Sequence, residues 1–225
     1  MRRGLATALL CVALLPAGAG AETEVSGRVS LGVDGLSLDA VAPVVVYLEA
    51  LGATHPGVPP RAVRRMRQRD AHFSPPFLVV AAGQPVEMAN DDAIYHNVFS
   101  YSRPNDFDLG LYPAGESRTL VLRHPGIVKI YCSIHESMNA TILVAPTPWF
   151  DVVGAGGDYA LRGVPPGRYR AVVWSERLPR STRELEVKAR GRQSLDWVIG
   201  SPSAKEAPRT PAASSAGSAG EIRNP

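Results

Sequence analysis

Short runs in which apolar and polar residues alternate dominate the hydrophobic pattern of this chain. Every second residue from Val25 to Leu31 is apolar or glycine, and residues 42–48 form a second run rich in β-branched side chains. A period of two is typical of a strand that buries one face. Glycine and proline stand between the runs, where turns are expected. Residues 22–52 are therefore predicted to supply strands.

The same pattern continues through residues 60–146. Runs that predict strands lie at residues 77–80, 85–88, 94–101, 118–123, 127–132 and 140–144. Several short strands at this spacing favour an all-β sandwich. Val128, Ile130 and Cys132 share one face of their strand, so we expect Cys132 to point inward at the strand end. Residues 133–139 are then predicted to form a loop.

The first 21 residues have the pattern of a secretory signal peptide. Two arginines precede an apolar run that ends in small residues, with cleavage predicted after Ala21. The residue before Cys11 is a poor match to a lipid-attachment signal. No later stretch reaches the roughly 18 apolar residues that a membrane span requires. We therefore expect a periplasmic protein without a membrane span.

The charge of the chain gives no indication of a nucleic-acid partner, and none is expected. The whole chain has a formal net charge of +3, and residues 1–21 hold two arginines and no acid. Residues 71–146 hold four basic and seven acidic residues, whereas residues 147–199 hold nine basic and six acidic ones. This asymmetry can orient an encounter with a charged partner.

Removal of residues 1–21 leaves Cys132 as the lone cysteine, so no intrachain disulfide can form. One explanation for the lone cysteine is a buried, inert thiol with a structural role only. However, His135 and Met138 follow Cys132 at short spacing, and His96 lies 36 residues upstream. A thiolate, two imidazoles and a thioether form the ligand set of a mononuclear blue-copper site, because it suits copper in both oxidation states. The sequence therefore predicts an electron-transfer protein with one copper ion.

Three stretches carry a family resemblance. Residues 90–98 with His96-Asn97, residues 113–117, and residues 125–135 resemble the cupredoxins, the plastocyanin and amicyanin family of blue copper proteins. The short Cys-x2-His-x2-Met spacing is similar to the ligand loop of amicyanin. Ile134 and Glu136 stand where such loops usually carry proline. The resemblance implies a Greek-key cupredoxin β-sandwich.

The same resemblance implies a role for each site residue. His96, Cys132 and His135 are the expected equatorial copper ligands, and Met138 is the expected weak axial ligand. Asn97 is expected to donate its backbone N–H to the Cys132 sulfur and to hold the ligand loop through its side chain.

Residues 147–199 resemble a different family. A Gly-Asp-Tyr strand, a Pro-Pro-Gly turn and a tyrosine-containing strand are similar to the carboxypeptidase regulatory-like, transthyretin-like β-sandwich. This segment lacks the first two strands of that fold, and residues 22–52 look like them. Because 53 residues alone would give a thin core, we predict one smaller sandwich, split by the inserted cupredoxin domain. Residues 200–225 are rich in serine, alanine, proline and glycine and are predicted to be disordered.

Other motifs are explained by ordinary structural roles and do not indicate a functional site. The arginine-rich run at residues 61–69 is predicted to be a charged face on a short helix or an edge strand. His55, His72 and His124 have no second ligand at a metal-binding spacing and are expected at the surface. No further histidine clusters are available for multicopper oxidase chemistry, so we expect no enzymatic activity.

Three functions remain open. The leading hypothesis is a periplasmic electron carrier that cycles Cu(II)/Cu(I) and exchanges electrons with a redox protein partner through His135. A copper carrier or storage protein could use the same ligands, and a non-metal scaffold module could retain them as a relic. The visible spectrum of the copper-loaded protein separates the three.

Overall fold

The structure is a computed structural model in which residues 23–33 and 35–200 are described. The predicted signal peptide lies outside these residues, as does the predicted tail beyond Gly200. The described residues form strands and one short 3-10 turn, η1 (Leu38–Val41), so the prediction of an all-β chain is confirmed. Within these ranges no helix has the length and apolar character needed to cross a membrane.

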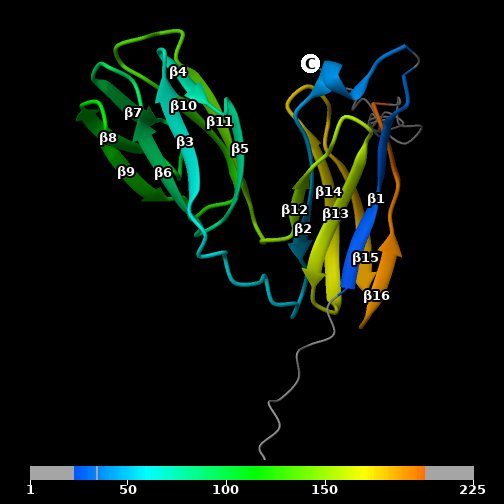
Figure 1. Cartoon of the computed structure of the whole chain (residues 1–225). Coiled ribbons are helices and arrows are strands. Elements are labelled where there is room, and N and C mark those ends of the chain that lie inside the picture. The colour runs from blue at the N-terminus through cyan, green and yellow to red at the C-terminus, as the bar shows by residue number, and fades with distance from the viewer. Residues whose placement is uncertain (1–22, 34, 201–225) are drawn as a thin grey trace, which may run out of the picture.

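The first of two β-sandwiches occupies the middle of the chain (Figure 1). Its five-stranded sheet has the order β5 (Phe77–Ala81), β11 (Asn139–Ala145), β10 (Gly126–Tyr131), β7 (His96–Ser100), β8 (Phe107–Tyr112). Its four-stranded sheet has the order β4 (His72–Ser74), β3 (Arg64–Arg69), β6 (Pro85–Asn90), β9 (Ser117–Val121). The inward faces of both sheets form one buried cluster.

The second sandwich combines strands from both ends of the described chain. One sheet contains β13 (Asp158–Val164), β1 (Thr23–Leu31) and β16 (Gly191–Ser194), with β17 (Trp197–Ile199) also paired to β1. The other has the order β12 (Phe150–Val152), β2 (Val44–Ala50), β14 (Gly167–Ser175), β15 (Ser181–Val187). β1 and β2 thus lie inside their sheets, with strands from residues 150–199 on both sides.

Gly27 shows why β1 accepts such close neighbours. A Cβ atom at this position would lie 2.2 Å from the backbone oxygen of Leu195, which is far inside van der Waals contact. The Leu195 N–H donates a hydrogen bond to the Ser26 oxygen at 2.9 Å. Glycine therefore lets the segment between β16 and β17 run directly over β1.

A third buried cluster joins the two sandwiches. It contains Val45 and Tyr47 from β2, Trp174 from β14, and Val79 and Leu143 from β5 and β11. These side chains point away from their own sandwich cores, so the outer face of one sheet packs on the outer face of the other. Figure 1 shows β5 and β11 on the side of the first sandwich that faces the second.

Two segments of the first sandwich differ from expectation. No strand is predicted between the runs at residues 94–101 and 118–123, but residues 107–112 form β8, which pairs with β7. The arginine-rich run contains β3, which lies between β4 and β6. Its arginines are exposed, whereas Met66 and Gln68 are fully buried. The charged face is therefore one side of a strand.

Candidate metal centre

The structure brings three of the predicted ligands together at one end of the first sandwich. The donor atoms of His96, Cys132 and His135 all lie within 4.8 Å of one another. His96 begins β7, Cys132 directly follows β10, and His135 lies in the loop between β10 and β11. β7 and β10 are paired neighbours, so residues that are far apart in the sequence meet here.

His96 is fully buried and is held from both sides of its ring. Its Nδ1 lies 3.8 Å from the Cys132 sulfur. Its Nε2 lies 2.9 Å from the Asp92 carboxylate. An ionised carboxylate can only accept, so Nε2 carries a proton, and in the neutral imidazole the Nδ1 lone pair then faces the thiol. This is the tautomer that a metal-binding imidazole needs.

Asp92 is itself fixed by backbone groups. Its carboxylate accepts hydrogen bonds from the Ala71 and Ala93 N–H groups, each at 2.8 Å. Hydrogen bonds lower the pKa of Asp92 to about 2. The largest effect comes from the Ala71 N–H, and smaller effects come from His96 and the Ala93 N–H. A permanently charged oxygen therefore faces the imidazole above strongly acidic pH.

His135 supplies the clearest test of whether the site fits a metal. Its Nδ1 is buried and has no hydrogen-bond partner among the described residues. Its ring centroid lies 5.1 Å from that of His96, at an interplanar angle of 59°. A buried polar nitrogen without a partner costs about 1–3 kcal/mol. Metal coordination through this nitrogen would remove the cost, and His135 belongs to the three-donor group.

The ligand loop is closed by backbone hydrogen bonds. The Cys132 N–H donates to the Met138 oxygen at 3.3 Å, and the Met138 N–H donates to the His135 oxygen at 3.0 Å. The Met138 side chain is fully buried and belongs to the same cluster as Cys132. The three residues therefore form one compact turn, with the thioether on the buried side.

Asn97 ties this loop to the neighbouring strand. Its side-chain oxygen accepts a hydrogen bond from the Ser133 N–H at 3.0 Å. Its amide nitrogen donates to Asp108 Oδ1 at 2.9 Å. Asp108 lies on β8, so one amide connects the ligand loop, β7 and β8. Such contacts hold a ligand in place before a metal arrives.

The donor set favours a soft or borderline transition metal. One thiol and two imidazole nitrogens meet in the site, whereas Mg²⁺ and Ca²⁺ take oxygen ligands. Copper and zinc are both held by thiolate and imidazole groups in proteins. The residues present therefore fit the copper that the sequence predicts.

Asp92 was not predicted to take part in the site. Its spacing of four residues from His96 was visible, but that spacing is meaningful in a helix and not at the start of a strand. The contact depends on the turn between β3 and β4, where Asp70 and Ala71 have positive φ angles. That turn presents the Ala71 N–H to the carboxylate.

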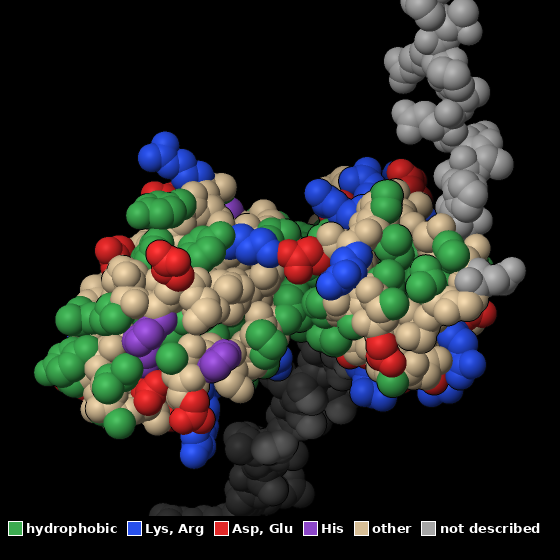
Figure 2. All heavy atoms as spheres, turned by 90° about the horizontal axis from the view of Figure 1, so that it is seen from above, with side chains coloured by type: hydrophobic (Ala, Val, Ile, Leu, Met, Phe, Trp, Pro, Cys, Tyr) green, Lys and Arg blue, Asp and Glu red, His purple; other side chains and the backbone are tan. Residues whose placement is uncertain are grey.

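Exposed apolar side chains stand next to the ligands. Ile134 precedes His135 and is 50% exposed, and Tyr95 precedes His96 and is 55% exposed. Leu111 is paired with Asn97 across β7 and β8 and is also exposed. In Figure 2, histidine side chains of the first sandwich lie among hydrophobic and acidic side chains. The surface beside the donor group is therefore more apolar than charged.

No protein-family model and no curated protein match this chain. Solved structures do match it. A purple cupredoxin from Nitrosopumilus maritimus is 22% identical, with a TM-score of 0.34, over 36% of this chain and 99% of that chain. An oxidized amicyanin variant is 18% identical, with a TM-score of 0.34, over 36% of this chain and 80% of that chain.

A copper-containing nitrite reductase from Thermus scotoductus SA-01 is 22% identical, with a TM-score of 0.36. The match covers 52% of this chain and 28% of the reductase, so this chain spans a minor part of that enzyme. The two cupredoxin matches each cover 36% of this chain. The resemblance of the second sandwich to transthyretin-like domains stays a prediction.

Proposed function

We propose that this chain is a type 1 copper protein that carries electrons outside the cytoplasm. The observation that supports this most directly is the buried, unpaired Nδ1 of His135. His135 belongs to the donor group that also contains His96 and Cys132. A buried histidine nitrogen without a hydrogen bond, on a residue grouped with a thiol and a second imidazole, is ready to bind a metal.

In this proposal His96, Cys132 and His135 are the strong ligands, and Met138 is the weak axial one. Bound copper supplies a one-electron change between Cu(II) and Cu(I). The protein residues keep the ligand positions the same in both states. Asp92 fixes the His96 ring, and Asn97 fixes the loop that carries the other ligands.

His135 is the proposed point of electron exchange. It is partly exposed, whereas His96 and Cys132 are buried. Ile134 and Tyr95 give the adjoining surface an apolar character. A redox protein partner in the periplasm can therefore dock on a small apolar contact, which is typical of transient redox encounters. The predicted signal peptide supports this location.

The visible spectrum of the copper-loaded chain tests the proposal. We expect an intense absorption from charge transfer between the Cys132 thiolate and Cu(II). Cys132→Ser should abolish it, because a hydroxyl is harder and stays protonated at neutral pH. Ser133→Ala is the matched control, since the neighbouring side chain is exposed and only its backbone N–H is used.

Three other results would count against an electron carrier. Blue colour retained in Cys132→Ser would remove Cys132 from the site. Colourless retention of Cu(I) that resists oxidation would indicate a copper carrier. Failure to bind stoichiometric copper would indicate a scaffold module.

A further inference from the structure

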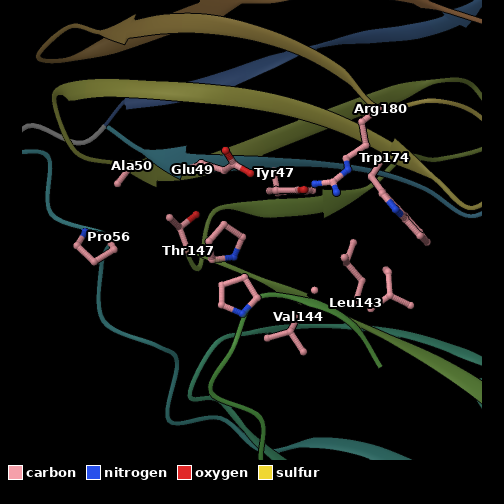
Figure 3. Close-up of a pocket in the computed structure, with 13 residues that line it drawn as sticks. Tyr47, Glu49, Ala50, Pro56, Leu143, Val144, Thr147, Trp174 and Arg180 are labelled. Carbon is pink, nitrogen blue, oxygen red and sulfur yellow. The ribbon is translucent and has the colours of Figure 1, made fainter. Parts of the chain in front are cut away.

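A pocket of 480 Å³ lies where the two sandwiches meet. Tyr47 and Trp174 line it from the second sandwich, and Leu143 lines it from the first (Figure 3). Ile127 of the first sandwich lines it as well. This volume lies in the range that small ligands occupy, and such sites are frequent at domain interfaces. The proposed electron-transfer function makes no use of this pocket.

The apolar walls of the pocket belong to a packed interface. Tyr47, Trp174 and Leu143 are members of the buried cluster that joins the sandwiches, and Ile127 packs against it. Across the same interface the rings of Phe77 and Trp174 stack at 5.6 Å, with 9° between their planes. The pocket is therefore shaped before any ligand binds, which lowers the entropy cost of binding.

The polar groups of the pocket leave an excess positive charge. Glu49 already pairs with Arg170 at 3.1 Å. Arg180 lines the pocket, and none of the ion pairs formed by the described residues uses it. In Figure 3 the Arg180 guanidinium is directed toward the hydroxyl end of Tyr47, across from Leu143 and Val144.

The Tyr47 hydroxyl is a second polar anchor. Burial raises the pKa of Tyr47, and the neighbouring Arg180 partly offsets that rise. Tyr47 therefore remains a neutral O–H group that can donate a hydrogen bond. A guanidinium and a phenol hydroxyl at one end of an apolar pocket match an anionic head on an apolar body.

We propose that this pocket binds a small organic carboxylate with a flat or branched apolar body. Arg180 and the Tyr47 hydroxyl hold the carboxylate, and the ring of Trp174 with Ile127 and Leu143 encloses the apolar part. Arginine suits this role because its planar fork presents parallel N–H donors to both carboxylate oxygens.

The pocket and the metal centre lie at opposite ends of one strand. Gly126, the first residue of β10, lines the pocket, and Cys132 directly follows the last residue of β10. At about 3.3 Å per residue the two sites are roughly 20 Å apart along the strand. Occupancy of the pocket should therefore leave the copper ligands unchanged, so the two proposals can fail independently.

Benzoate is a suitable probe, and benzamide is its uncharged counterpart of the same shape. We would titrate both into the full chain prepared without added copper, and follow the methyl NMR signals of Ile127, Leu143 and Val144. Benzoate should give saturable shifts confined to the pocket-lining methyls. Benzamide should bind at least about tenfold more weakly, because it lacks the charge that Arg180 recognises.

Arg180→Gln should weaken benzoate binding by about tenfold or more and leave benzamide binding unchanged. Arg177→Gln is the matched control, because Arg177 is an exposed arginine in the same connection but does not line the pocket. Both side chains are exposed, so both variants should fold. Equal benzoate affinity in Arg180→Gln and Arg177→Gln would overturn the proposal. Absence of saturable shifts up to the solubility limit of benzoate would overturn it as well.

Discussion

A single carboxylate holds the ring of the buried His96, which is a proposed ligand. The Nε2 atom of His96 lies 2.9 Å from Asp92, which also accepts the Ala71 N–H. An anionic partner makes the imidazole more basic, so it should favour Cu(II) over Cu(I) at the proposed site. Asp92→Asn keeps the shape of the side chain and removes its charge.

We expect Asp92→Asn to raise the reduction potential and to lower Cu(II) affinity by about 10–100-fold. Voltammetry and copper titration against a competing chelator would measure the two effects. Asp91→Asn is the control, because the Asp91 carboxylate pairs with Arg67 at 3.1 Å instead of with a ligand. Similar shifts in both variants would show that general surface charge is responsible.

The same residue predicts a pH dependence for the copper-free protein. The pKa of Asp92 falls from 3.8 to about 2 on folding. Its contribution to the free energy of unfolding is therefore fully present above pH 3.8 and is lost as pH falls toward 2. The stability difference between wild type and Asp92→Asn, measured by denaturant unfolding, should shrink across this interval. A difference that stays constant would contradict the assignment.

Met138 allows a milder test. Its side chain is 1% exposed, so Met138→Leu replaces it with a group of similar volume and disturbs the packing little. Loss of a weak axial donor destabilises Cu(II) more than Cu(I), so copper should remain bound and the potential should rise. An unchanged potential would show that the Met138 sulfur is not a ligand.

These residue-level features differ in how far the sequence reveals them. Cys132, His135 and Met138 are close in the sequence, so a short loop must bring them together. Their residue types alone indicate that they can bind a metal. The contacts of Asp92 depend on a turn between two other strands. No pattern within residues 90–96 encodes that turn.

At the scale of elements, four strands carry apolar residues on both faces. In β2, Val44, Val46 and Leu48 face the core of the second sandwich, whereas Val45 and Tyr47 face the first sandwich. β5, β11 and β14 divide their side chains in the same way. Continuous apolar runs are typical of strands covered on both sides. The strands were predicted, but their second covered face was missed, because a run does not indicate which surface covers it.

The position of β1 and β2 makes a sharp prediction for fragments. β1 lies between β13 and β16, and β2 lies between β12 and β14. Deletion of residues 22–52 should therefore expose the buried faces of the remaining strands and unfold residues 147–199. A fragment of residues 147–200 should be unfolded or aggregated in circular dichroism and sedimentation measurements. A folded, monomeric fragment would show that the second sandwich does not need the N-terminal strands.

At the scale of the whole molecule, the two sandwiches are joined by packing as well as by the chain. The Phe77 and Trp174 rings stack across the interface. An ion pair between Lys129 on β10 and Glu176, which follows β14, also crosses it. Both lobes and the charged side chains near the junction are visible in Figure 2. Two sandwiches are predictable from the sequence, but their relative placement is not, because contacts such as Phe77–Trp174 join residues far apart in the sequence.

The second sandwich does not cover the end of the first sandwich where the proposed ligands lie, so this end is the expected docking site of the proposed redox partner. The second sandwich covers the outer face of β5 and β11, whereas Ile134 and His135 lie in the loop beyond β10. Ile134 is half exposed, and Glu136 is the one charged residue in the loop of residues 132–138. Docking there should depend on apolar contact more than on electrostatic steering, so its rate should vary little with salt.

Ile134→Lys should therefore slow electron exchange with the native partner by about tenfold, since a buried lysine charge is costly in a small apolar contact. The copper spectrum should stay nearly unchanged, because the side chain adjoins a ligand without being one. Val198→Lys is the control, as Val198 is 60% exposed on the distant strand β17. Exchange measured by stopped-flow absorbance at several ionic strengths separates the two possible surfaces. A rate that is unaffected by Ile134→Lys but falls steeply with salt would move the docking surface to the acidic residues Asp91, Asp92, Asp106 and Asp108.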